Sequence, residues 1–135
     1  MVTASDIMTS HVVTIRQTAS VREALQTLDE LDVRHLPVVD EREGLVDMIS
    51  ERDLLRLRRS QDVLAQPVSE VMSGDVVVVT PATDVVEIID LMTENRIGAV
   101  PVVDNDSQLA GIVSYVDVLR AAGKVLAQPE PLLTS

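Results

Sequence analysis

The sequence contains no cysteine, phenylalanine or tryptophan, and it has a single tyrosine, Tyr115. The absence of cysteine excludes disulfide bonds, thiolate zinc ligands and thiol nucleophiles. The scarcity of aromatic residues leaves almost no side chain on which a nucleic-acid base could stack. Long apolar runs are missing too, because the longest, Val76–Val79, is far too short to cross a bilayer. The first residues show no signal-peptide pattern, so we expect a soluble, cytoplasmic protein that does not contact membranes.

The charge balance also narrows the possible partners. The 135 residues include 22 acidic and 11 basic side chains, which gives a net charge of −11. Nucleic-acid binding depends largely on lysine and arginine, so we expect no nucleic-acid partner. A small phosphorylated ligand is still possible, because a few local cations are enough to hold it.

The most informative feature present is an internal repeat. Shifted by 64 positions, Ser5–Arg56 aligns with Ser69–Arg120 without a gap, and 16 of the 52 positions are identical. The clearest matches join Leu36–Asp40 to Val100–Asp104 and Ser50–Asp53 to Ser114–Asp117. Such a repeat predicts one supersecondary unit used twice, with the two units burying apolar faces on each other. We expect the function in the groove between the copies, where the symmetry creates two clefts.

Each copy predicts the same succession of elements. A short helical turn precedes a strand, a helix, two further strands and a final helix. In the first copy these are residues 6–8, Val12–Ile15, a helix opening at Ser20, Leu36–Val39, Leu45–Ile49 and a helix from Ser50. In the second copy they are residues 70–72, Val76–Thr80, a helix opening at Asp84, Val100–Val103, Leu109–Val113 and a helix from Ser114. Ser20 and Asp84 are each followed three residues later by glutamate, the spacing of a capping box.

The predicted fold class is α+β. We expect two tandem β-α-β-β-α motifs packed with pseudo-two-fold symmetry, each with a three-stranded sheet and two helices. The motifs span residues 1–60 and 68–126, with a linker at 61–67 and a flexible tail at 127–135. The apolar stripes of Val21–Leu31 and Val85–Met92 exceed what one small sheet can cover, so we expect a homodimer formed through these helices.

The two Pro-containing strands, each followed by a Ser-x-x-Asp segment, resemble the CBS motif, named after cystathionine β-synthase. Residues 3–122 together resemble a stand-alone CBS pair. The resemblance implies a regulatory module rather than an enzyme, with an adenosine-containing ligand (AMP, ADP, ATP or S-adenosylmethionine) in the clefts between the motifs. The resemblance implies that the protein requires no cofactor, and it does not identify the effector protein.

The resemblance also implies roles for individual residues. The ribose hydroxyls would be bound by Asp117 or Asp53, with Ser114 and Ser50 as the associated hydroxyls. The adenine would meet the backbone that leads into the first strand of a copy, at Asp75, Val76 and Val77 or at His11, Val12 and Val13. The base would also be lined by Gly98, Ala99, Ile112 and Tyr115 in the second copy, and by Arg34 and His35 in the first.

The two predicted clefts are unequal. Arg34 and His35 stand where the second copy has glycine and alanine, and the resemblance assigns this basic pair to the phosphate end of the Asp117 cleft. We therefore expect the Asp117 cleft to be the better nucleotide site, with binding strengthened when His35 gains a proton below about pH 6.5. Asp47 in place of Gly111 is a further difference between the copies.

Several of these residues have alternative, purely structural interpretations. A carboxylate three residues after serine is also a helix-capping arrangement, which applies to both Asp53 and Asp117. Arg34 and His35 follow a helix end, where the helix dipole favours cations. If the clefts are vestigial, the protein is instead a ligand-free module for dimerisation or protein interaction.

Metal binding and catalysis have no clear candidates. Neither histidine has a partner at metal-ligand spacing, and Asp104–Asp106 predicts a tight turn rather than a calcium loop. No Ser-His-Asp set, carboxylate pair or glycine-rich phosphate loop is visible. Arg56, Arg58 and Arg59 predict a solvated helix face.

Overall fold

The computed structural model describes residues 1–57 and 61–128, so Arg58, Arg59 and the tail from residue 129 lie outside it. The first part of the chain forms α1 (Ala4–Ile7), β1 (Ile15–Arg16), α2 (Val21–Leu31), β2 (His35–Val39), β3 (Leu45–Ser50) and α3 (Glu51–Leu57). The second part forms α4 (Gln61–Leu64), the 3-10 turn η1 (Val68–Glu70), α5 (Val85–Asn95), β4 (Ala99–Val103), β5 (Leu109–Ser114) and α6 (Tyr115–Leu126). The α+β class and the tandem motifs are therefore confirmed.

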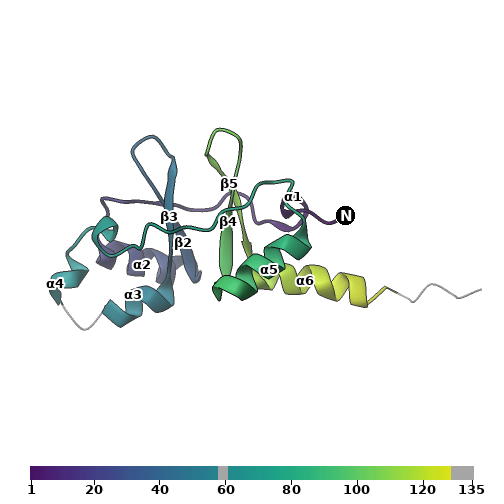
Figure 1. Cartoon of the computed structure of the whole chain (residues 1–135). Helices are drawn as coiled ribbons and strands as arrows, with labels where there is room; N and C mark the ends of the chain where they lie inside the picture. Colours follow the sequence, from purple (N-terminus) through teal and green to yellow (C-terminus); the bar gives the residue numbers. More distant parts are fainter. Residues whose placement is uncertain (58–60, 129–135) are drawn as a thin grey trace, which may run out of the picture.

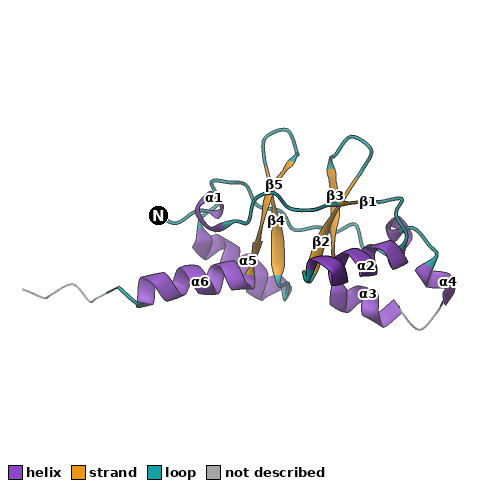
Figure 2. Ribbon diagram, turned by 180° about the vertical axis from the view of Figure 1, so that it is seen from behind, coloured by secondary structure: helices purple, strands orange, loops and turns teal. Residues whose placement is uncertain are grey.

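The two β-hairpins lie next to each other at the centre of the molecule (Figure 1). Helices α2, α3 and α4 lie on the side of β2 and β3, and α5 and α6 lie on the side of β4 and β5, as the reverse view also shows (Figure 2). A bridge between Gly44 and Gln108, which occupy equivalent positions in the two copies, joins the hairpin turns. In each turn the first aspartate accepts two backbone N–H bonds: Asp40 from Arg42 and Gly44, and Asp104 from Asp106 and Gln108. The predicted tight turn at Asp104–Asp106 is thus confirmed.

The two sheets differ in strand number, which corrects the expectation of three strands in each. In the first sheet β1 runs parallel to β2, and β2 pairs antiparallel with β3. The second sheet has only β4 and β5 within the described residues, with a single bridge from Val79 to Val102 in place of a third strand. The reason is residue 81. In the first copy Gln17 N donates to Val39 O at 2.9 Å, whereas its counterpart Pro81 has no N–H to donate.

The helix caps follow the sequence only partly. Ser20 accepts a bond from Glu23 N at 3.1 Å, and Asp84 accepts one from Val86 N at 2.9 Å, so neither forms the complete capping box that was expected. Ser114 does form a complete box with Asp117 at the start of α6. The first strand is also shorter than predicted in the first copy and reduced to the Val79 bridge in the second, because Val12–Thr14 and Val76–Val78 have no strand pairing and instead run between the copies.

The leading segments of the two copies are exchanged. Ala4 of α1 is buried in the second core beside Ile88 and Val100, and α1 accordingly lies over the second copy (Figure 1). Val68 of η1 is buried in the first core beside Leu28. Each core is therefore completed by a segment that belongs, in sequence, to the other copy.

The backbone holds this exchange in the same way at both ends. Ala4 N donates to Thr83 O, and Val85 N donates to Val2 O, each at 2.8 Å. The equivalent pair joins Val68 N to Ala19 O at 2.8 Å and Val21 N to Gln66 O at 2.9 Å. The segment predicted as a linker contributes to this arrangement, since it contains α4 and leads directly into η1.

The exchange makes a prediction about stability. Val68→Ala should lower the free energy of unfolding by about 2 kcal/mol, because it removes two methyl groups from a fully buried site. Amide hydrogen exchange should accelerate in α2 and β2 of the first copy. Val78→Ala, at an exposed position, is the matched control and should change stability by less than about 0.5 kcal/mol. Faster exchange confined to β4 and β5 would contradict the exchanged arrangement.

Candidate functional site

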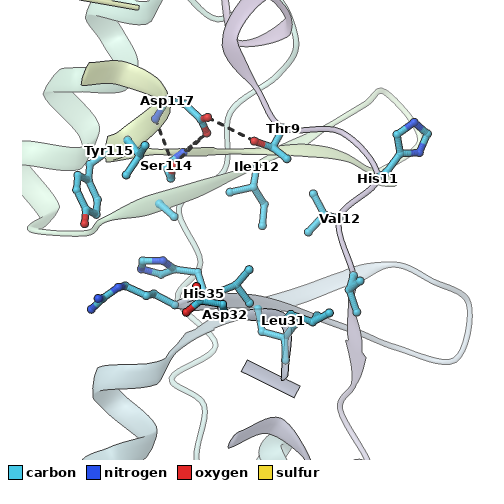
Figure 3. Close-up of a pocket in the computed structure, with 16 residues that line it drawn as sticks. Thr9, His11, Val12, Leu31, Asp32, His35, Ile112, Ser114, Tyr115 and Asp117 are labelled. Atoms are coloured by element: carbon cyan, nitrogen blue, oxygen red, sulfur yellow. Dashed lines mark hydrogen bonds between the residues drawn. The ribbon is translucent and has the colours of Figure 1, made fainter. Parts of the chain in front are cut away.

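Two clefts lie between the copies, each named here after its candidate ribose-binding aspartate. The Asp117 cleft has a volume of about 460 Å³ (Figure 3). It is lined by Thr9, His11, Val12, Val13, Leu31, Asp32, Val33, Arg34, His35, Leu36, Ala99, Ile112, Ser114, Tyr115, Val116 and Asp117. Its walls therefore come from the leading segment of the first copy, the α2–β2 turn and the β5–α6 junction.

Asp117 is fixed at the start of α6 by the capping box. Its Oδ2 atom accepts bonds from Ser114 N at 2.9 Å and from Ser114 Oγ at 3.1 Å. Its Oδ1 atom has the longer contacts, 3.4 Å to Thr9 Oγ1 and 3.8 Å to Arg120 Nη1. The side chain is 8% exposed and borders the cleft. One oxygen thus caps the helix, while the other is available to accept a hydrogen bond from a ligand hydroxyl.

Arg34 and His35 lie on the opposite wall, where the chain leaves α2 and enters β2. The turn depends on Asp32, which ends the helix in the left-handed conformation with a φ of 52°. The His35 side chain lies across the cleft from Ser114 and Tyr115 in Figure 3. A Cβ atom at Gly98 would lie 3.2 Å from the imidazole Cε1, so glycine at that position leaves room for the ring.

Burial lowers the pKa of His35 below its ordinary value, and the nearby Arg34 cation lowers it further, although the Asp53 carboxylate opposes this shift. His35 is therefore a neutral hydrogen-bonding group at pH 7, and Arg34 alone carries the positive charge of the pair. The pH at which His35 becomes a cation is thus lower than the 6.5 expected from sequence.

The Asp53 cleft is larger, with a volume of about 1200 Å³. It is lined by Arg34, His35, Asp47, Met48, Ser50, Glu51, Arg52, Asp53, Leu55, Arg56, Ser73, Asp75, Val76, Val77, Arg96, Ile97, Gly98, Ala99, Pro101 and Tyr115. Ser50 Oγ accepts a bond from Asp53 N at 3.1 Å, which caps α3. Unlike Asp117, Asp53 is exposed, and no hydrogen bond to its carboxylate occurs among the residues that the structure describes.

The structure brings most of the predicted residues together, but it regroups them. Arg34, His35, Ala99 and Tyr115 border both clefts. Val12, Val13, Ile112 and Ser114 border the Asp117 cleft, whereas Ser50, Asp75, Val76, Val77 and Gly98 border the Asp53 cleft. Asp75–Val77 belong in sequence to the second copy but border the Asp53 cleft of the first, because the leading segments are exchanged between the copies.

Sequence reasoning missed some residues that line the clefts. Thr9 borders the Asp117 cleft, and Arg52 and Arg96 add cations to the Asp53 cleft. Arg56, predicted on a solvated face, also borders the Asp53 cleft. Arg96 aligns with Asp32 in the repeat, and both residues end a helix in the left-handed conformation, so they occupy equivalent positions beside the two clefts.

Two further features of the described residues concern groups of metal ligands and helices that could span a membrane. Among residues 1–57 and 61–128, no three or more His, Asp or Glu side chains are grouped so that they could hold a metal ion. Over the same ranges, no helix combines the length and apolarity needed to span a membrane.

Comparison with known proteins identifies the class of protein that this fold and these clefts define. The CBS domain family model matches residues 4–60 and 68–124, so the chain belongs to the CBS domain family. Its two copies together form a CBS pair.

The relatives differ in how much of their own length the match covers. An uncharacterised 17.7 kDa protein of Acidianus ambivalens is 32% identical over 117 residues, which cover 87% of this chain and 71% of that protein. An inosine-5'-monophosphate dehydrogenase of Methanocaldococcus jannaschii is 30% identical over 117 residues, but the match covers only 23% of that enzyme.

Solved structures share the fold over nearly the whole chain. The CBS domain pair of protein MJ0100, in complex with 5'-methylthioadenosine and S-adenosyl-L-methionine, has a TM-score of 0.84 and 28% identity. The match covers 93% of this chain and 98% of that one. CBSX2 in complex with AMP has a TM-score of 0.84 and 30% identity, and the match covers 93% of this chain and 99% of that one. CBS pairs of this fold are generally ligand-binding regulatory modules.

The lowered pKa of His35 predicts a specific pH dependence of stability. Below about pH 6.5 the unfolded chain binds a proton that folded His35 does not, so the free energy of unfolding should fall as pH drops from 6.5 toward the folded pKa. Urea unfolding at pH 7.5 and 5.5 should show a smaller loss for His35→Asn than for the wild type. His11→Asn, at an exposed position, is the matched control and should retain the wild-type loss. Identical losses in the wild type and His35→Asn would contradict this account.

Proposed function

We propose that the protein is a regulatory module that binds an adenosine-containing ligand (AMP, ADP, ATP or S-adenosylmethionine) in the clefts between its CBS motifs and reports it to an effector protein. The observation that carries the proposal is the Asp117 carboxylate, which is held at the start of α6 and borders a cleft of about 460 Å³. This volume is within the usual range for small-molecule sites. The ligands in the MJ0100 and CBSX2 complexes support the same ligand class.

The chemistry of the Asp117 cleft suits a nucleoside phosphate. The carboxylate would accept the ribose hydroxyls, and the apolar side chains of Val12 and Ile112 would contact the base. Arg34 on the opposite wall would pair with a phosphate, and neutral His35 would add a hydrogen bond. Local cations are needed for this purpose, since a net charge of −11 repels anions at long range.

The alternative is a ligand-free interaction module in which Asp117 only caps α6. The complete capping box supports this alternative, since it satisfies Oδ2 without any ligand. The two functions are chemically compatible, because capping uses Oδ2 and leaves Oδ1 with longer contacts. We also expect the module to act in the cytoplasm without a nucleic-acid partner.

Asp117→Ala should weaken AMP binding by about tenfold or more, which corresponds to the loss of a charge-assisted hydrogen bond. Calorimetric titration of the folded variant with AMP provides the measurement. Asp6→Ala is the matched control, since Asp6 closes a capping box with Thr3 in α1 but borders neither cleft. Unchanged AMP affinity in folded Asp117→Ala would leave this carboxylate with the capping role alone.

We also propose that the protein forms a homodimer, but through different residues from those first expected. Leu28 and Met92, the centres of the two predicted stripes, are 1% and 7% exposed and belong to the cores of the chain itself. The apolar side chains that remain exposed include Val86 on α5 and Leu119 on α6, at 61% and 64%. Exposed apolar groups on neighbouring helices are typical of an interface.

Leu119→Glu should therefore convert a dimer into a folded monomer, because it puts a charge into the proposed interface. Sedimentation velocity at tens of micromolar gives the oligomeric state, and Val78→Glu, on the segment between η1 and α5, should remain dimeric. A wild-type monomer under these conditions would refute the proposed dimer.

A further inference from the structure

One repeat position, the third residue of the last strand in each copy, is glycine in one copy and a buried aspartate in the other. Gly111 occupies it in β5, and Asp47 occupies it in β3. Asp47 is only 3% exposed, so its carboxylate is enclosed by the protein although it borders the Asp53 cleft. The two positions contact the exchanged leading segments in different ways.

The leading segment of the first copy lies directly on β5 of the second copy. Thr9 N donates to Ile112 O at 2.8 Å, and Ile112 N donates to Thr9 O at 3.0 Å. A Cβ atom at Gly111 would lie 2.7 Å from Thr9 O and 2.8 Å from Met8 Sδ. Any side chain at position 111 would therefore force this segment away from the strand.

In the first copy the Asp47 carboxylate stands between β3 and the leading segment of the second copy. Its Oδ1 atom accepts a bond from Met48 N at 2.7 Å, and its Oδ2 atom accepts one from Gly74 N at 2.9 Å. Met48 is the counterpart of Ile112, and Ser73 is the counterpart of Thr9, so a carboxylate replaces the direct backbone pairing. Gly74 has a φ of +80°, a conformation that glycine adopts at little cost.

The segment held in this way forms a wall of the Asp53 cleft. Ser73 and Asp75–Val77, on either side of Gly74, border that cleft. The cleft has a volume of about 1200 Å³, against about 460 Å³ for the cleft whose leading segment lies directly on its strand. The larger cleft is also bordered by four arginines, Arg34, Arg52, Arg56 and Arg96, which balance its four carboxylates, Asp47, Glu51, Asp53 and Asp75. Within the described residues the smaller cleft is bordered by one arginine, Arg34, and two carboxylates, Asp32 and Asp117.

We propose that Asp47 is a positioning residue that holds the Ser73–Val77 segment away from β3 and so makes the Asp53 cleft the site for the longer, more highly charged ligand, a nucleoside triphosphate. The ligand choice rests on the proposed function, whereas the positioning role does not. Arginine pairs well with phosphate oxygens, so added phosphates gain most in the cleft that has more arginines. The Asp117 cleft then binds the nucleoside monophosphate or the nucleoside.

The positioning role is tested without any ligand, by amide hydrogen exchange in NMR spectra. In Asp47→Gly the Gly74 amide should exchange about tenfold faster or more, because it loses its acceptor. The Met48 amide should stay protected through new pairing with Ser73. Asp47→Asn keeps one acceptor oxygen and the same shape, so it should fold and exchange at an intermediate rate. Unchanged Gly74 exchange in both variants overturns the proposal.

The reciprocal variant supplies a matched control on the other copy. Gly111→Ala should displace Thr9 and speed exchange of the Ile112 amide about tenfold, while Gly74 and Met48 remain as in the wild type. An unaffected Ile112 amide would contradict the role given to this repeat position.

The ligand choice is tested by titration with ATP and AMP in two backgrounds. In the Asp117→Ala background the Asp53 cleft remains intact. Adding Asp47→Gly there should weaken ATP binding by about tenfold and AMP binding by less than about threefold. In Asp53→Ala the same change should leave both affinities unaltered. Equal weakening of ATP and AMP, or equal effects in both backgrounds, overturns the size selection. If the wild type binds neither nucleotide, the proposed function fails, and exchange at Gly74 still decides the role of Asp47.

Discussion

The constraint on which the rest of the structure depends is the exchange of leading segments between the two copies. Neither core is complete without it, because Ala4 fills the second core and Val68 fills the first. Four equivalent backbone hydrogen bonds hold the two segments in place. An isolated copy would lose these contacts and expose apolar surface, so the copies are expected to fold as one unit rather than as two independent domains.

The same exchange builds the clefts. The chain must pass from α1, over the second copy, to β1 in the first copy, and this crossing carries His11–Val13 past the start of α6. The crossing from η1 to the Val79 bridge beside β4 carries Asp75–Val77 past the start of α3 in the same way. Ligand-sized clefts therefore arise from the connections that complete the cores, and Asp117 and Asp53 stand at their edges, at the starts of α6 and α3. Packing and candidate function use the same segments.

The sequence could predict the features that depend on local rules. The repeat, the β-hairpins and the serine caps at Ser20 and Ser114 follow from identities at a fixed spacing and from side chains that satisfy their own helix starts. The exchange could not be predicted, because a helical turn such as α1 has the same sequence pattern whichever core it enters. Its effect on the site was large, since it places Asp75–Val77 beside the start of α3 in the first copy rather than in the cleft of Asp117.

Differences between the copies arise from single substitutions whose effect depends on tertiary contacts. Pro81 removes one donor and reduces a strand to a bridge. Asp47 occupies the repeat position that is Gly111 in the second copy, where the backbone of Thr9 packs too closely for any side chain. Arg34 and His35 border both clefts, so a phosphate bound beside Arg34 in one cleft changes the field in the other. A symmetric scaffold thus yields two unequal clefts that share one cationic wall, and the inequality follows from residues that differ while the fold stays the same.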